Sequence, residues 1–253
     1  MLEQIKAIVL EAGSIVTSAE DISAKTIEKN GAADLVTYYD TAVEQFLREK
    51  LTALLPDALF FGEESEKTGD PAKGWVFIVD PIDGTTNFVR GMSQSAISVA
   101  LAKDGVIEYG VVLDPFKKEL FSAQRGCGAH LNGAPIHVSD RTLDKGIFGM
   151  GTAIYNREFE EQTISVTAQL FKRSCDFRRM GAAALDLCYI AAGRYDVFFE
   201  FSLAPWDFAA GSLIITEAGG RIRTIDGKTL PIARCGIWAS NVVNDHILSE
   251  LVF

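Results

Sequence analysis

The stretch WVFIVDPIDGTTNF, residues 75–88, decides how the rest of this chain is interpreted. It begins with five apolar residues that predict a buried strand, and then reaches Asp80 and Asp83, two carboxylates three positions apart. Pro81 and Gly84 predict a turn at this point. An ordinary turn explains one Asp and the Gly, but not a second Asp and two threonines behind a buried strand. Two oxygen ligands beside free backbone N–H groups are typical of a site that holds divalent cations against a phosphate.

The composition is that of an ordinary globular protein. The 253 residues are 48% hydrophobic and 23% charged, which suits one large domain or two smaller ones. No run approaches the roughly 20 apolar residues of a membrane span, and the N-terminus lacks the regions of a secretory signal, so we expect a cytoplasmic protein without membrane attachment.

The 24 basic and 34 acidic residues give a formal charge of −10, which disfavours direct nucleic-acid binding. Because the protein is negative overall, we expect that it can bind a phosphate group only with metal ions that make the local charge positive.

The cysteines and histidines exclude several classes of enzyme. The four cysteines are scattered without a C-x-x-C pair, and without a secretion signal we expect reduced thiols. The three histidines belong to no H-E-x-x-H motif or zinc cluster, and no G-x-S-x-G motif accompanies them. The chemistry is therefore expected to depend on carboxylates and hydroxyls.

The apolar spacing predicts an α+β protein whose two halves differ in organisation. The first half is expected to hold helices at 2–20 and 40–55 and strands at 59–62, 75–79, 95–102, 106–113 and 119–123, mostly antiparallel. The second half is expected to alternate, with strands near 147–152, 175–178, 196–201 and 220–225 and helices near 158–172, 181–193, 206–218 and 243–251. Since no linker separates the halves, we expect a single unit, 1–253, with two lobes, 1–140 and 141–253, that share one cleft.

Three local signals refine this assignment. Thr41 and Glu44 have capping-box spacing at the start of the second helix, which places Asp40 at its N-terminus. The sequence Lys-Asp-Gly at 103–105 predicts a hairpin turn, and Asn-Gly at 132–133 predicts another turn.

Further acids are candidates for the same site. Glu63 and Glu64 follow a short apolar strand, whose alternation points only one of them inward. Asp207 opens a helix that is otherwise apolar, where a carboxylate is costly to bury without a partner such as a metal. Asp40 is either a helix cap or a site residue, and Glu200 ends an apolar run.

Taken together, these motifs resemble the inositol monophosphatase family of metal-dependent sugar and inositol phosphatases. The resemblance covers essentially the whole chain and rests on the segments 34–40, 62–65, 80–88 and 206–211, in this order. It implies a layered αβαβα sandwich, as in the superfamily that includes fructose-1,6-bisphosphatase, and it suggests a homodimer.

The resemblance also implies roles for individual residues. The implied metal ligands are Glu63, Asp80, the carbonyl of Ile82, Asp83 and Asp207. Glu64 is expected behind these ligands or near a third metal, and Lys29 is expected on a loop near the metals. Thr85, assisted by Asp40, is expected to orient the attacking water.

The remaining implied roles concern the substrate. The backbone N–H groups of Gly84 and Thr85, with Thr86, are expected to face the phosphate beside Asp83 and Asp207. The pocket for the leaving alcohol is implied to be lined by Gly181, Ala182, Ala183 and Glu200.

The expected activity is Mg²⁺-dependent hydrolysis of myo-inositol monophosphate by an inositol-1-monophosphatase. Oxygen ligands favour Mg²⁺ over zinc or copper. Two or three ions would support in-line attack by a metal-activated water held by Glu63 and Thr85. The alternatives are fructose 1,6-bisphosphate, histidinol phosphate or 3′-phosphoadenosine 5′-phosphate as substrate, and a non-catalytic role as a partner of transcription or RNA-processing machinery. Arg178 and Arg179 are interpreted as a subunit contact or surface ion pair in preference to a site for a second phosphate.

Overall fold

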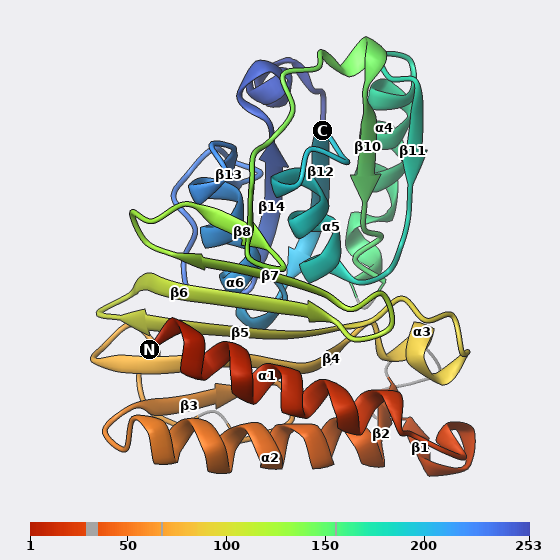
Figure 1. Cartoon of the computed structure of the whole chain (residues 1–253). Coiled ribbons are helices and arrows are strands. Elements are labelled where there is room, and N and C mark those ends of the chain that lie inside the picture. Colours follow the sequence, from red (N-terminus) through yellow and green to blue (C-terminus); the bar gives the residue numbers. More distant parts are fainter. Residues whose placement is uncertain (29–34, 67, 155) are drawn as a thin grey trace.

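The computed structural model describes residues 1–28, 35–66, 68–154 and 156–253. Helices and sheets alternate in layers, which confirms the expected α+β sandwich (Figure 1). Helices α1 (Leu2–Thr17) and α2 (Tyr38–Leu54) cover one face of a seven-stranded sheet. Helices α5 (Ala183–Ala191) and α6 (Pro205–Glu217) fill the space between this sheet and a five-stranded one. Helix α4 (Glu160–Phe171) covers the outer face of the second sheet.

The start of α2 differs from the prediction. The helix begins two residues earlier than expected, at Tyr38, and its N-cap is Thr37, whose hydroxyl accepts hydrogen bonds from the N–H groups of Tyr39 and Asp40. The carboxylate of Asp40 accepts in return from the Thr37 N–H at 2.7 Å, which completes the capping box. The expected box of Thr41 and Glu44 is therefore wrong, because Thr37 supplies the cap one turn earlier.

The seven-stranded sheet follows the order of the chain. Its strands are β3 (Leu59–Gly62), β4 (Trp75–Asp83), β5 (Ala96–Lys103), β6 (Val106–Asp114), β7 (Glu119–Gln124), β8 (Ala129–Leu131) and β9 (Ala134–Ile136). Only the β3–β4 pair among these is parallel. The expected hairpin between β5 and β6 is confirmed, since Asp104 and Gly105 both have positive φ angles, 49° and 81°.

Strand β4 is longer than the sequence predicted. It continues through the expected turn to Asp83, and its register against β5 shifts between Asp80 and Asp83. An irregularity of this kind re-aims side chains at the end of a strand. The turn comes at Gly84, which has a φ of 85° and precedes a short helix, α3 (Thr85–Val89), that the sequence analysis did not predict.

The second sheet contains one strand that the sequence analysis missed. Its order is β11-β10-β12-β14-β13, formed by β10 (Ile147–Met150), β11 (Asp176–Arg178), β12 (Val197–Leu203), β13 (Arg221–Thr224) and β14 (Cys235–Ser240). The missed strand, β14, pairs with both β12 and β13. The expected C-terminal helix is a 3₁₀ segment, η4 (Val242–Glu250).

The two central helices are packed closely against their neighbours. A Cβ on Gly110 of β6 would come within 2.7 Å of the Ala210 carbonyl in α6, and a Cβ on Gly211 would come within 2.8 Å of Leu187 in α5. Both helices are apolar on most of their surface, as expected for helices buried in a core. This packing fixes the N-terminal ends of α5 and α6 relative to the end of β4.

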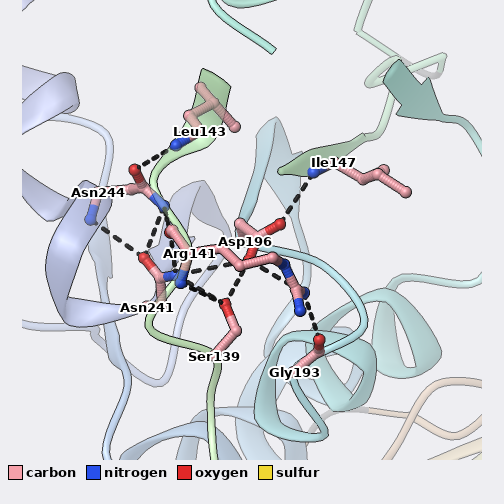
Figure 2. A network of polar contacts seen from close by, with 8 residues as sticks. All are labelled: Ser139, Arg141, Leu143, Ile147, Gly193, Asp196, Asn241 and Asn244. Atoms are coloured by element: carbon pink, nitrogen blue, oxygen red, sulfur yellow. Dashed lines mark hydrogen bonds and ion pairs between the residues drawn. The ribbon is translucent and has the colours of Figure 1, made fainter. Parts of the chain in front are cut away.

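A polar network holds the connection that enters the second sheet (Figure 2). The buried carboxylate of Asp196 accepts a hydrogen bond from the Ile147 N–H at 2.9 Å and lies 3.2 Å from the Arg141 guanidinium. The amide of Asn241 donates to the Ser139 hydroxyl at 3.0 Å and to the Arg141 carbonyl at 2.9 Å. The buried charge is therefore paired and hydrogen-bonded, as a stable core requires.

The remaining elements are short. They are β1 (Thr26–Glu28), β2 (Leu35–Thr37) and the 3₁₀ turns Ile22–Lys25, Leu143–Lys145 and Arg157–Phe159. Across the described ranges, no helix combines the length and the apolar character that crossing a membrane requires.

Candidate active site

A cavity of about 490 Å³ lies where β4 ends and where α5 and α6 begin. It brings together most of the residues that the sequence singled out. Those that line it are Glu63, Asp80, Ile82, Asp83, Gly84, Thr85, Thr86, Gly181, Ala182, Ala183, Glu200 and Asp207. This volume is in the range typical of small-molecule sites.

Of the described residues that were expected at the site, Asp40 and Glu64 do not line the cavity. Asp40 lies behind Thr85 and reaches its hydroxyl at 3.2 Å. Glu64 follows Glu63 and donates its backbone N–H to the Glu44 carboxylate at 2.8 Å. Lys29 lies outside the described residues.

The aspartates of β4 are held by backbone donors. Asp80 accepts a hydrogen bond from the Ile82 N–H at 3.0 Å, across the irregular end of the strand. Asp83 accepts from the N–H of Ala184, in the first turn of α5, at 2.7 Å. Each of these bonds fixes the carboxylate that it reaches.

Asp207 both holds the start of a helix and contributes to the cavity. It lies in the first turn of α6, and its carboxylate accepts a hydrogen bond from the Ala204 N–H at 2.7 Å, so it caps the helix. It also lines the cavity. The hydroxyl of Ser98 on β5 donates to the Trp206 carbonyl at 3.1 Å, which holds this turn against the first sheet.

The acidic groups in the cavity share an environment that disfavours their ionisation. Burial raises the pKa of Asp83 to about 7 and that of Asp207 to about 8. The pKa of Asp80 lies well above its ordinary value, first because of burial and then because of the charges of Glu63, Asp83 and Asp207. Burial also raises the pKa of Glu200 to about 7.

This donor set fits hard divalent cations. Several buried carboxylates of like charge face one cavity, and cations of this kind are the partners that would stabilise their ionised forms. Within the described residues, no three acidic, histidine or cysteine side chains already stand together as a metal-binding cluster. The nearby side chain of Glu63 is among the causes that raise the pKa of Asp80.

Thr85 lies at the start of α3 with its hydroxyl directed toward two acceptors. The hydroxyl is 3.2 Å from the Asp40 carboxylate and 3.1 Å from the Ile82 carbonyl. Burial raises the pKa of Asp40 to about 6, against the hydrogen bonds from Thr37 that lower it. A hydroxyl that donates to these acceptors keeps its lone pairs for a molecule in the cavity.

Backbone contacts join the α3 segment to the segment before α5. A Cβ on Gly84 would come within 2.9 Å of the Gly181 carbonyl and 3.1 Å of the Gln94 carbonyl. The amide of Asn87 donates to the carbonyls of Gln94 and Met180, both at 2.8 Å. These contacts set the distance between the two walls of the cavity.

The sequence analysis missed functional candidates in the same cavity. Asp186 lies in α5, is buried, and has one carboxylate oxygen with no hydrogen-bond partner in the described part of the chain. Its sequence signal was an acid within the apolar run of residues 183–191, the same signal that identified Asp207. Arg234 also lines the cavity, and no local pattern marked it.

The layered fold and the acid-lined cavity together indicate a class of metal-dependent phosphatases. The whole chain, residues 1–253, matches the model of the inositol monophosphatase family, and the protein belongs to this family.

Individual relatives agree with this assignment. The chain is 38% identical over 250 residues to an inositol-1-monophosphatase of Rhizobium meliloti, which covers 98% of this chain and 92% of that protein. It is 39% identical over 219 residues to the Nus factor SuhB of Escherichia coli, covering 86% of this chain and 82% of the relative. The structure of an inositol monophosphatase from Anabaena superposes with a TM-score of 0.87 at 32% identity and covers 98% and 93% of the two chains.

Proposed function

We propose that this protein is a Mg²⁺-dependent phosphomonoesterase that hydrolyses myo-inositol monophosphate to inositol and phosphate. The observation that carries the proposal is the convergence of Asp80, Asp83 and Asp207 with Glu63 on one cavity that also contains Glu200. The similarity to the Rhizobium meliloti inositol-1-monophosphatase supports the choice of substrate.

The proposed Mg²⁺ ligands are Glu63, Asp80, the Ile82 carbonyl, Asp83 and Asp207. Oxygen donors of this type favour Mg²⁺ over zinc and copper. When bound, two or three such ions supply charge neutralisation for the phosphoryl oxygens and make water a stronger nucleophile. The positions of these side chains are fixed beforehand by the backbone hydrogen bonds from Ile82, Ala184 and Ala204.

Thr85 and Glu63 are the proposed residues that handle the attacking water. The Thr85 proton is directed to Asp40 or to the Ile82 carbonyl, so the hydroxyl oxygen accepts a hydrogen bond from the water and orients it. Glu63, which lines the same cavity, is the carboxylate that accepts the proton of the water during attack.

The phosphate and the alcohol are proposed to bind on different walls. The backbone N–H groups at Gly84, Thr85 and Thr86 begin α3, where the first N–H groups have no partner within the helix, and they are suited to phosphate oxygens. The small side chains of Ala182 and Ala183 leave room for a ring, and Glu200 accepts hydrogen bonds from ring hydroxyls.

The test is phosphate release from inositol 1-phosphate, measured with and without Mg²⁺. We expect turnover only with the metal present, and we expect it to disappear in EDTA. Fructose 1,6-bisphosphate, histidinol phosphate and 3′-phosphoadenosine 5′-phosphate complete the panel. Absence of Mg²⁺-dependent release from all four compounds would overturn the proposal.

A second candidate function comes from the similarity to proteins named Nus factor SuhB. In this alternative the protein binds transcription or RNA-processing machinery without catalysis. A pull-down with the wild-type protein and with the Asp83→Asn variant distinguishes the two functions. A stable complex that survives in the variant, together with inactivity of the wild type on all four phosphates, would favour this alternative.

A further inference from the structure

Glu44 of α2 is a buried carboxylate that the proposed function does not use. The residue is only 5% exposed. The sequence analysis assigned it to a capping box, but that box is formed by Thr37 and Asp40. Because a buried carboxylate is costly unless other groups replace its water, the partners of Glu44 indicate its role in the fold.

The partners of Glu44 lie on the segment that follows β3. One oxygen of the Glu44 carboxylate accepts a hydrogen bond from the Glu64 N–H at 2.8 Å, and the other accepts from the Ser65 hydroxyl. Arg48, one turn further along α2, donates to the same hydroxyl and lies 3.8 Å from the Glu44 carboxylate. Hydrogen bonds to a charged group are stronger than those between neutral groups, so α2 holds this segment firmly.

The residue before this segment is also fitted to Glu44. A Cβ on Gly62 would overlap both the Glu44 carboxylate and the Phe60 ring. The φ angle of Gly62 is not in the left-handed region, so close approach and not backbone conformation accounts for the glycine. Glu44 therefore contacts the chain on both sides of Glu63.

Glu63 lies at the point where the sheet stops holding this part of the chain. Strand β3 ends at Gly62, which pairs with Val79 of β4, and the Glu63 N–H donates to the Val79 carbonyl at 3.1 Å. This register brings Glu63 beside Asp80. Strand β4 thus fixes the backbone before the Glu63 side chain, and Glu44 fixes the backbone after it.

We propose that Glu44 is a positioning residue that sets the direction in which Glu63 enters the cavity. The inference rests on the proposed function, in which Glu63 is a Mg²⁺ ligand and accepts a proton from the water. Glu44 does not line the cavity, so it acts through the backbone of residues 62–65. Loss of a group that orients a metal ligand typically costs about 10–100-fold in metal affinity or activity.

The first test is Mn²⁺ binding without substrate, followed by the electron paramagnetic resonance signal of the free ion. Mn²⁺ takes the same carboxylate and carbonyl ligands as Mg²⁺. Glu44→Gln keeps the shape of the side chain, but it loses the charge and its single oxygen cannot serve both donors as the carboxylate does. We expect the Kd for Mn²⁺ to rise at least about tenfold. Ser65→Ala keeps the bond from Glu64 and should cause a smaller rise.

Turnover of inositol 1-phosphate provides the second measurement. In Glu44→Gln, the Mg²⁺ concentration that gives half the maximal rate is expected to rise by at least about tenfold as well. The KM for inositol 1-phosphate at saturating Mg²⁺ is expected to stay near that of the wild type, because the wall proposed for the alcohol is unchanged. A general loss of structure would not separate these two constants.

Two control variants separate positioning from charge and from stability. Glu49→Gln removes a charge from the exposed side of α2, where Glu49 accepts a hydrogen bond from Gln45. Val9→Ala removes two methyl groups from a fully buried side chain of α1 in the same core, so it lowers the free energy of unfolding, which urea unfolding measures. Neither variant should change the Kd for Mn²⁺.

Three results would overturn the proposal. One is an unchanged Kd for Mn²⁺ in Glu44→Gln. Another is an equal rise of this Kd in Val9→Ala, since lower stability alone would then explain the effect. If Glu44→Gln does not fold, Ser65→Ala decides, because Glu44 stays in place in that variant, and an unchanged Kd there is the third.

The two measurements also distinguish this inference from the proposed function. Mn²⁺ binding that weakens in Glu44→Gln, while the wild type hydrolyses none of the four phosphates, would support the positioning role and contradict the catalytic function. Turnover by the wild type, with the same Mn²⁺ binding and Mg²⁺ dependence in Glu44→Gln, would support the function and overturn the positioning role.

Discussion

The carboxylate of Asp83 accepts a hydrogen bond from the N–H of Ala184 at 2.7 Å, although the two residues are 101 positions apart in the chain. Asp83 ends β4 of the first sheet, and Ala184 lies in the first turn of α5, between the sheets. This single bond joins the acidic wall of the cavity to the wall proposed for the leaving alcohol.

Asp83→Asn separates the charge of this residue from its hydrogen bond. The amide oxygen of Asn can still accept from Ala184, so we expect a folded protein that has lost nearly all Mg²⁺-dependent phosphate release. Asp83→Ala removes both features and is expected to lower the free energy of unfolding by about 1–3 kcal/mol as well. Urea unfolding and phosphate release on both variants provide the measurement, and normal turnover by Asp83→Asn would sink the site assignment.

The buried carboxyls predict a pH dependence of stability that a metal should abolish. With pKa values of about 7 for Asp83 and about 8 for Asp207, the native state keeps protons that the unfolded state releases from about pH 4 upward. The unfolded state binds fewer protons in this window, so the free energy of unfolding falls as the pH rises from about 4 to 8.

The pKa values of Asp83 and Asp207 also set the expected size of this loss of stability. At about 1.4 kcal/mol per pKa unit, we expect each of these two groups to contribute a loss of about 2–4 kcal/mol between pH 5 and pH 8 in EDTA. Mg²⁺ should flatten the profile, because it stabilises the ionised carboxylates. Denaturation curves at both pH values, with EDTA and with Mg²⁺, test this; a chelated protein that becomes more stable toward pH 8 would contradict it.

Gly84→Ala should force apart the two cavity walls. The backbone at Gly84 has a φ of 85°, and the added Cβ would meet the Gly181 carbonyl at 2.9 Å. We expect a loss of about 1–3 kcal/mol in stability together with reduced kcat/KM. Gly74→Ala is the matched control, since it has a φ of 65° with nothing within 4 Å of the new Cβ. Equal effects of the two substitutions on kcat/KM would show that the contact does not matter.

Thr85→Val tests the orientation of water by the hydroxyl. Valine keeps the shape of threonine but cannot donate to Asp40 or the Ile82 carbonyl and cannot accept from water. We expect kcat to fall by about 100-fold or more with a smaller change in KM. Thr85→Ser, which keeps the hydroxyl, should retain most of the activity; a Ser variant as slow as the Val variant would contradict a role for the hydroxyl.

Much of the first half of the fold could be predicted from local patterns. The buried residues of α1 follow helical spacing, and the hairpin between β5 and β6 has a two-residue turn of the expected kind. Strand β14 could not be recognised, because it contains Gly236 and is paired on both sides, so it lacks the alternation of a half-exposed strand. The extension of β4 to Asp83 also depends on pairing with β5, which no local pattern records.

The candidate site likewise contains residues that could be identified from the sequence and residues that could not. Asp80, Asp83 and Asp207 could be identified because acids inside apolar segments are conspicuous, and Asp186 could have been identified in the same way. Arg234 could not, since an exposed arginine in a loop has no distinctive surroundings in the sequence. Its place in the cavity follows from the arrangement of the two sheets, which is a property of the whole chain.

The distribution of the acids along the chain also has a consequence during translation. Glu63, Asp80 and Asp83 leave the ribosome well before the Ala184 N–H, which follows Asp83 by 101 residues, and before Asp207. At about 5–20 residues per second, the nascent first half waits roughly 5–20 s for these partners. During this interval the carboxylates repel one another, and Asp83 lacks the Ala184 N–H that holds it. Tight metal binding should therefore begin only after α6 has emerged, which makes it a reporter of the assembly of the site.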